Sequence, residues 1–138
     1  MCIRDRYYNN KKGGQISIIS SVAGYRGLPA AGGYCASKSA LTSFAESLHF
    51  EMKRVNVRVS LISPGFIKTP MTDQNDFPMP MIKSPEFAAE QIYIGLIKNK
   101  GFEIHFPKAF TFIMKTLRIL PSSWYFKIVE KGMKKIDY

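Results

Sequence analysis

The sequence predicts an α/β fold built around a parallel β-sheet. Two short runs, 15–20 and 57–62, are rich in β-branched and apolar residues, which is typical of strands buried inside such a sheet. Residues 33–54, which lie between these runs, carry apolar side chains at helical spacing. A third predicted strand, 101–106, follows a second predicted helix at 84–99. Strands that alternate with helices in this way favour a parallel sheet.

The first predicted strand ends in two adjacent serines, Ser20 and Ser21. The strand is apolar at alternate positions on both sides, so we expect both of its faces to be buried. In open α/β sheets, ligands bind outside the carboxyl ends of the strands, which is where these hydroxyl groups lie. We therefore expect a hydroxyl group from this strand end to reach the oxygen atom of a bound molecule.

The helix predicted at 33–54 carries a tyrosine and a lysine one turn apart, Tyr34 and Lys38. Residues four positions apart lie on the same face of a helix. A phenol has a pKa of ~10 in water, and a neighbouring cation favours the phenolate and lowers that pKa. A group whose pKa approaches the operating pH is an efficient proton donor or acceptor. Together with Ser21, the pair predicts proton transfer to or from an oxygen atom.

The same helix also has a simpler interpretation, because many amphipathic helices carry a surface tyrosine beside a solvated lysine. Its apolar residues form a single stripe that we expect to face the core. We expect His49, which follows this stripe, to have a packing or surface role and no catalytic one. The stripe consists of Leu41, Phe44, Ala45, Leu48 and Met52.

The second predicted strand is stopped by Pro64 and Gly65, and a loop follows. This loop can offer a backbone N–H group and the hydroxyl group of Thr69 to an amide group of a ligand; a simple turn is the alternative. Residues 71–83 combine methionine, phenylalanine and proline, which predicts either a mobile lid over an apolar substrate or loose loop packing. Ser84, followed by a proline and a glutamate, predicts the start of the next helix.

Three segments resemble the classical short-chain dehydrogenase/reductase family. Residues 14–21 resemble its fifth strand, and residues 34–52 resemble its catalytic helix. Residues 57–69 resemble its sixth strand and the Pro-Gly-x-x-x-Thr turn that follows. The resemblance is close over residues 13–72 and looser over 73–106. It implies the C-terminal half of a Rossmann-like, doubly wound parallel sheet.

The resemblance implies an oxidoreductase that transfers a hydride between a nicotinamide cofactor, NAD or NADP, and a carbonyl/alcohol substrate. Tyr34 would be the general acid/base, Lys38 would lower the Tyr34 pKa and hold the nicotinamide ribose, and Ser21 would position the substrate oxygen. Ser20 is expected to have a structural role. The residues expected to bind the cofactor are Tyr34, Lys38, Pro64, Gly65, Ile67 and Thr69.

The family's glycine-rich phosphate-binding turn, which follows the first strand of the fold, has no counterpart in these 138 residues. We interpret residues 1–6 as an artefact of a sequencing-library adaptor, with a genuine short N-terminus as the alternative. Residues 7–106 are then the C-terminal half of the family's domain, so we expect a truncated chain. We expect the full-length protein to be a homo-oligomer, and we expect truncation to impair both dimerisation and activity.

Residues 107–138 form a basic tail, with seven lysine and arginine residues against two acidic ones, a net charge of +5. Pro121 divides it into two predicted helices, the second of which contains a tryptophan. Basic amphipathic segments with aromatic residues are typical of a peripheral membrane contact. A helical pair that covers the substrate pocket or a partner subunit is the alternative. The apolar stripe of the first helix consists of Phe110, Ile113, Met114, Leu117 and Leu120.

Composition is that of an ordinary globular protein, with 46% hydrophobic and 22% charged residues. The two cysteines show no paired spacing, so we expect neither a disulfide framework nor a metal site. No apolar run approaches the ~18 residues of a membrane-spanning helix, and no signal peptide is recognisable, so we expect a cytoplasmic location. The net charge of +10 also fits nucleic acid, but no recognised binding motif supports that partner.

Two functions from different classes follow from the sequence. The first is the oxidoreductase described above, acting on a small molecule that the lid and the tail suggest to be apolar or lipid-like. The second is a non-catalytic, membrane-associated or scaffold protein that keeps the fold. The presence of Ser21, Tyr34 and Lys38 together favours the enzyme.

Overall fold

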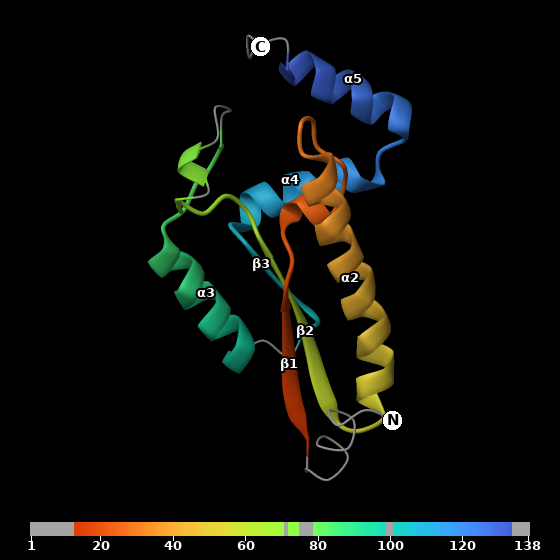
Figure 1. Ribbon diagram of the computed structural model, residues 1–138, viewed down its shortest axis with the longest axis vertical. Coiled ribbons are helices and arrows are strands. Elements are labelled where there is room, and N and C mark those ends of the chain that lie inside the picture. The colour runs from red at the N-terminus through yellow and green to blue at the C-terminus, as the bar shows by residue number, and fades with distance from the viewer. Residues whose placement is uncertain (1–12, 71, 75–78, 99–100, 134–138) are drawn as a thin grey trace.

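The computed structural model describes residues 13–70, 72–74, 79–98 and 101–133, so the interpretation of residues 1–6 lies outside it. Helices and strands alternate along the chain and then give way to two consecutive helices (Figure 1). The elements are β1 (Gly14–Ile19), the 3-10 turn η1 (Val22–Gly24), α2 (Gly32–Lys53), β2 (Val57–Pro64), the 3-10 turn η2 (Thr72–Gln74), α3 (Pro85–Lys98), β3 (Glu103–Phe106), α4 (Lys108–Ile119) and α5 (Ser122–Met133).

The sheet has the order β1-β2-β3, and both pairs of neighbouring strands are parallel. Ser17 is in register with Ser60, and Ile62 is in register with Ile104. Helices α2 and α3 lie on opposite sides of this sheet (Figure 1). The α/β, Rossmann-like architecture that the sequence predicts is therefore confirmed over the described residues.

The central strand β2 forms the middle of the core, and α3 closes one side of it. Val59, Leu61 and Ile62 of β2 are almost fully buried. On the α3 side, Ile62 packs in a cluster with Ala88, Ile104 and Phe106. Helix α3 comes so close to β3 that a Cβ atom added at Gly95 would lie 2.6 Å from the Ile104 side chain. The absence of a side chain at position 95 allows this approach.

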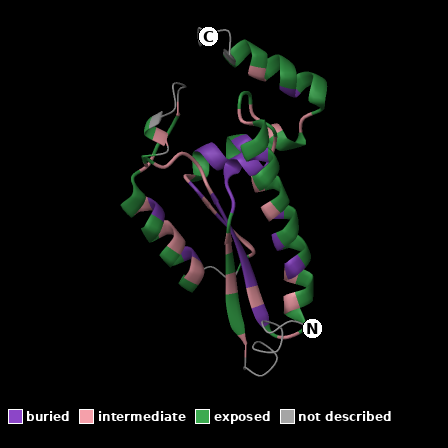
Figure 2. Cartoon of the chain, in the orientation of Figure 1, coloured by how far each residue is buried: buried purple, intermediate pink, exposed green. Residues whose placement is uncertain are grey.

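The prediction that β1 is buried on both faces is wrong for the described residues. Gln15, Ser17 and Ile19 are exposed, and Ile19 retains 56% of its accessible surface. Figure 2 shows the contrast between this strand and the buried residues of β2. The physical reason is that β2 is the only strand paired with β1 in the part of the chain that the structure describes, which leaves β1 at an edge.

Helix α2 is found where the sequence predicts it, but its buried face is rotated relative to the predicted stripe. Ala45 and Leu48 are buried as expected, whereas Phe44 keeps 49% of its surface exposed. The buried face instead includes Thr42, whose hydroxyl lies 3.1 Å from Ser20 Oγ. The strand end therefore draws a polar face of α2 toward the sheet.

The two tail helices differ in how they contact the rest of the chain. Phe110, Thr111 and Met114 of α4 are buried, whereas Ile113, which belongs to the predicted stripe, is exposed. In α5, Tyr125 is the one residue that is almost fully buried among those described. None of the helices in the described residues combines the length and the apolar character needed to span a membrane.

Candidate active site

Ser21 lies directly after β1 in an extended conformation and caps the 3-10 turn η1. Its Oγ accepts a hydrogen bond from the backbone N–H of Ala23 at 3.2 Å. The same hydroxyl donates to the carbonyl oxygen of Pro64 at 3.5 Å. The side chain is buried. Ser21 therefore connects the carboxyl end of β1 to the carboxyl end of β2, where ligands bind in open α/β sheets.

The neighbouring serine, Ser20, is occupied within the fold. Its Oγ donates to the carbonyl oxygen of Lys38 at 2.9 Å and lies 3.1 Å from Thr42 Oγ1. Gly24 sits against the same helix, where an added Cβ atom would lie 2.9 Å from the Lys38 carbonyl oxygen. Ser20 and Gly24 thus fix the strand end to α2.

Tyr34 and Lys38 lie one turn apart near the start of α2. The Lys38 Nζ atom is 5.6 Å from the centroid of the Tyr34 ring, and it donates to the carbonyl oxygen of Ile19 at 3.3 Å. The Tyr34 side chain is 47% exposed, so a molecule in solution can reach it. Lys38 therefore brings a positive charge to both the tyrosine and the end of the strand that leads to Ser21.

The turn after β2 is held against the start of the tail. The Gly65 N–H donates to the carbonyl oxygen of Phe106 at 2.7 Å. A Cβ atom added at Gly65 would lie 2.9 Å from the Phe110 ring and 3.1 Å from Pro107, so any side chain here would require a shift. Ile67 then forms an isolated parallel bridge with Lys83. The turn is thereby fixed at both ends.

Thr69 pairs with a residue that the sequence reasoning missed, Thr72. The hydroxyl of Thr72 accepts from the Thr69 N–H at 2.7 Å, donates to the Ile67 carbonyl oxygen at 2.9 Å and lies 3.3 Å from Thr69 Oγ1. The repeat of threonine after three positions is a signal for such a turn. In the predicted lid, residues 71 and 75–78 lie outside the described residues, and Met81 is exposed.

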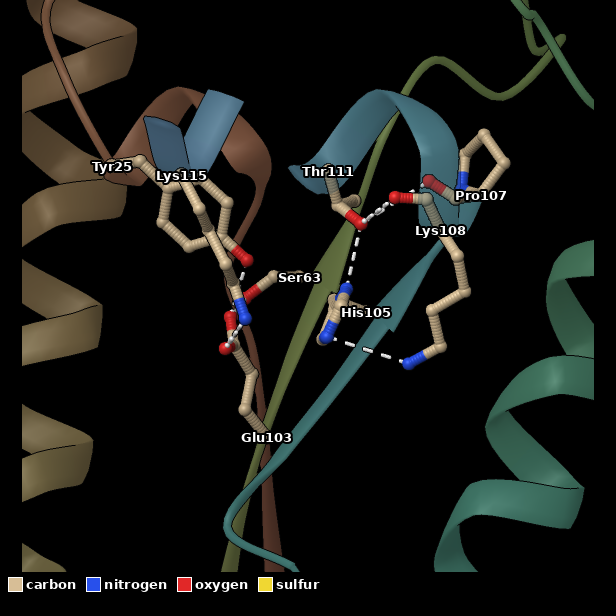
Figure 3. Close-up of polar contacts among 8 residues, drawn as sticks. All are labelled: Tyr25, Ser63, Glu103, His105, Pro107, Lys108, Thr111 and Lys115. Carbon is tan, nitrogen blue, oxygen red and sulfur yellow. Dashed lines mark hydrogen bonds and ion pairs between the residues drawn. The ribbon is translucent and has the colours of Figure 1, made fainter. Parts of the chain in front are cut away.

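A polar cluster around Glu103 was also missed by the sequence reasoning (Figure 3). The Glu103 carboxylate accepts hydrogen bonds from Tyr25 Oη, from Ser63 Oγ at 2.8 Å and from Lys115 Nζ at 2.6 Å. Burial alone would raise the pKa of the Glu103 carboxyl group, but these hydrogen bonds hold that pKa below its usual value. Burial, followed by the bond to Glu103, raises the pKa of Tyr25 far above that of a free phenol. The cluster therefore contains an ionised carboxylate and a neutral phenol at neutral pH.

A second polar contact joins β3 to α4. His105 Nδ1 lies 2.6 Å from Thr111 Oγ1, and His105 Nε2 lies 3.4 Å from Lys108 Nζ (Figure 3). Burial and then the charges of Lys115 and Lys108 lower the pKa of His105. His105 is therefore neutral at pH 7, and it anchors α4 without adding a charge.

The residues present fit the nicotinamide end of a dinucleotide. The Tyr34 phenol and the Lys38 ammonium group lie close together, with Tyr34 open to solvent, and the turn that contains Gly65 and Thr69 follows the neighbouring strand. The described residues hold no glycine-rich turn of the kind that binds a pyrophosphate between a first strand and its helix. They also contain no group of three or more residues suited to holding a metal ion.

Comparison with known proteins gives a consistent result. A family model described as short chain dehydrogenase matches residues 3–78. An uncharacterised oxidoreductase from Myxococcus xanthus is 36% identical over 112 residues, which cover 81% of this chain and 44% of that protein. Human epidermal retinol dehydrogenase 2 is 33% identical over 131 residues, which cover 91% of this chain and 40% of that protein. The chain thus spans less than half the length of these relatives.

Solved structures resemble the chain in the same way. A short chain dehydrogenase from Burkholderia cenocepacia in complex with NADP matches with a TM-score of 0.74 and 24% identity, covering 91% of this chain and 51% of that one. One from Mycobacterium paratuberculosis bound to NAD matches with a TM-score of 0.61 and 25% identity, covering 74% and 46% of the two chains. The first likeness is evidence for the fold alone.

Proposed function

Because the chain belongs to the short-chain dehydrogenase family, whose members use NAD or NADP, we propose that it carries the catalytic end of an oxidoreductase that interconverts a carbonyl and an alcohol. The observation that carries the proposal is the set of contacts at the carboxyl end of β1. There, Lys38 touches both the Ile19 carbonyl group and the Tyr34 ring, and Ser21 reaches across to Pro64.

Tyr34 acts as the general acid/base in this proposal. Its exposed phenol can give a proton to a carbonyl oxygen or take one from an alcohol. The ammonium group of Lys38 lies beside the ring and stabilises the negative charge that the phenolate carries. Such a pair moves a proton at the substrate oxygen and at no other atom.

Ser21 holds the substrate oxygen in place. Its contact with the Pro64 carbonyl oxygen is 3.5 Å long, which is at the long limit for a hydrogen bond, so the hydroxyl can turn to a substrate oxygen at little cost. The bond that its Oγ accepts from the Ala23 N–H fixes the oxygen while the hydrogen rotates. The substrate class that the exposed Met81 favours is apolar or lipid-like.

For the cofactor, NAD or NADP, we propose contacts with Tyr34, Lys38 and the turn after β2. The bound nicotinamide supplies or accepts the hydride, which no side chain can do. The turn contributes Pro64, Gly65, Ile67 and Thr69, and the Thr69 hydroxyl can exchange its 3.3 Å contact with Thr72 for one with a ligand. We also propose that the complete protein is a homo-oligomer, as the resemblance to the family implies.

Two neighbouring serines provide the test of this function. We expect Ser21→Ala to lower turnover by about 10- to 1,000-fold, as removal of a hydrogen-bond donor at a reacting oxygen does, while the thermal midpoint changes little. Ser20→Ala is the matched control, because it removes a hydroxyl that is bonded to α2. It is expected to lower the stability by about 1 kcal/mol and to retain most of the turnover.

The measurement is NAD(P)H oxidation with apolar ketones, followed at 25 °C in the complete protein that carries this chain. Circular dichroism melting curves of the same three proteins report the stability. Equal turnover in Ser21→Ala and the unchanged protein would contradict the role of Ser21 as a substrate-positioning residue.

A second candidate function, contact with an anionic membrane, is favoured by the surface of α4 and α5. Apart from the buried Tyr125, most of the aromatic side chains of these helices point to solvent, and so do four basic residues. Glu130 is the one acidic residue within the two helices. A surface of this composition complements anionic lipid headgroups. The exposed residues are Phe112, Ile113, Ile119, Trp124, Phe126 and Ile128, with Lys108, Arg118, Lys127 and Lys131.

Phe112→Asp tests this contact, with Phe50→Asp as the control because Phe50 is exposed on α2, away from the tail. We expect Phe112→Asp to reduce the fraction that sediments with vesicles of phosphatidylglycerol and phosphatidylcholine by several-fold. Raised salt should weaken the binding of the unchanged protein, since exposed charges are screened. If both variants partition as the unchanged protein does, the tail is not a membrane contact.

A further inference from the structure

The segment 22–28, which joins Ser21 to the start of α2, rests on the tail helices. We infer that α4 and α5 set the position of this segment through Arg26, which acts as a positioning residue for Ser21 and Tyr34. The inference rests on the proposed function, because it gives the tail a role in that same site. Neither residue type nor spacing in the sequence indicates this link, since Arg26 is about ninety positions away from its partners.

Arg26 caps the carboxyl end of α4. Its Nη1 donates to the carbonyl oxygens of Leu117 at 2.8 Å, Arg118 at 3.1 Å and Leu120 at 2.7 Å. Its Nη2 donates to Ser122 Oγ, the first residue of α5, at 3.3 Å. The last carbonyl groups of a helix lack partners within the helix and carry partial negative charge, so a guanidinium group there is well matched. One side chain thus holds the junction of both tail helices.

Helix α5 adds its own contact with the same segment. The Tyr125 ring lies under the Arg26 guanidinium group, with 4.1 Å from the Arg26 Cζ atom to the ring centroid. The Tyr125 hydroxyl donates to the carbonyl oxygen of Gly27. A planar guanidinium group can stack on a ring while it donates in its own plane, and an ammonium group cannot do both. Arg26 and Tyr125 therefore form one interlocked pair.

The Glu103 cluster provides a second attachment for the segment. Tyr25, the residue before Arg26, donates to Glu103, and Glu103 is paired with Lys115 of α4 (Figure 3). Val22 and Tyr25 also pack against Phe110 and Met114 of α4. The segment is therefore attached to α4 by polar and apolar contacts on both sides of Arg26.

The other end of the segment reaches the catalytic helix. The Leu28 N–H lies 3.3 Å from Cys35 Sγ, and Cys35 follows Tyr34 directly. Ser39 Oγ donates to the Gly24 carbonyl oxygen at 3.1 Å. A shift of the segment relative to α4 would thus move the first turns of α2 and the turn that Ser21 caps. This geometry connects the tail to both catalytic side chains.

The test compares Arg26→Met with Arg26→Lys, and uses Arg54→Met as the control because Arg54 is exposed at the opposite end of α2. Hydrogen exchange of the chain is the readout that does not depend on activity. We expect amides of residues 22–28 to exchange at least tenfold faster in Arg26→Met than in the control, with Arg26→Lys between them. Exchange in β2 should stay unchanged. Tyr125→Phe, a milder change, should accelerate the same amides to a smaller extent.

The second readout is catalysis in the complete protein. We expect kcat of Arg26→Met to fall about tenfold with little change in KM for the cofactor, and Arg26→Lys to recover part of the loss. Tyr34→Phe should leave exchange of residues 22–28 unchanged, so a protein without turnover in any form would refute the proposed function and not the attachment. Equal exchange in Arg26→Met and Arg54→Met, or full turnover with accelerated exchange, would overturn the inference.

Discussion

Replacement of Tyr34 by phenylalanine is expected to abolish nearly all turnover while the cofactor still binds. The change removes one oxygen atom from a half-exposed side chain that makes no hydrogen bond through its hydroxyl group within the described residues. A positioned general acid or base contributes about 10²- to 10⁴-fold to the rate, and we expect a loss of that size. Measurement of kcat with NADH and NADPH in the complete protein checks the prediction.

The control for this variant is cofactor binding, followed by quenching of protein fluorescence. We expect the dissociation constant of Tyr34→Phe to lie within about threefold of that of the unchanged protein, because Lys38 and the turn after β2 are intact. A kcat within tenfold of the unchanged protein would contradict the role of Tyr34 as the proton donor. A total loss of cofactor binding would show that the ring is needed for binding before catalysis.

Replacement of Phe106 by alanine is expected to produce the largest loss of stability. Phe106 ends β3 and is 1% exposed, and it packs against Ile62, Ala88 and Ile104. Its ring meets the Phe87 ring edge to face, with the centroids 6.1 Å apart. Truncation of a buried phenylalanine to alanine lowers the free energy of unfolding by about 3–5 kcal/mol. Urea unfolding followed by circular dichroism measures this loss.

Phe112→Ala is the matched control, since the Phe112 ring is 59% exposed on α4. We expect it to change the free energy of unfolding by less than about 0.5 kcal/mol, as exposed substitutions usually do. Similar unfolding midpoints for the two variants would contradict the packing of β3 against α3. The difference between the two variants also checks which face of the tail region belongs to the core.

Local patterns in the sequence were sufficient to find the helices and strands. The apolar run at 57–62 lies within β2 and is buried, and Ser84 accepts a hydrogen bond from the Phe87 N–H at 3.2 Å where a helix start is predicted. Burial of β1 could not be read in the same way, because it depends on what lies beside the strand. An apolar strand is the same in sequence whether it has one neighbour or two.

The candidate site divides along the same line. The spacing of Tyr34 and Lys38 and the position of Ser21 after a strand are local, so the sequence indicates them directly. Glu103 and Arg26 find their partners across the fold, with 78 positions between Tyr25 and Glu103. Charged residues on a sequence have many alternative partners, and only the packed arrangement selects one. That is why the attachment of the tail to the segment after Ser21 was not predicted.

The most direct measurement of the central claim is deuterium transfer from 4-deuterated NADH and NADPH to a panel of apolar ketones and aldehydes. The complete protein that carries this chain would be incubated with each pair, and the alcohol products analysed by mass spectrometry. We predict that one deuterium atom appears on the carbinol carbon, and that Tyr34→Phe and Ser21→Ala suppress its transfer. Absence of deuterium from every product with both cofactors would contradict the account.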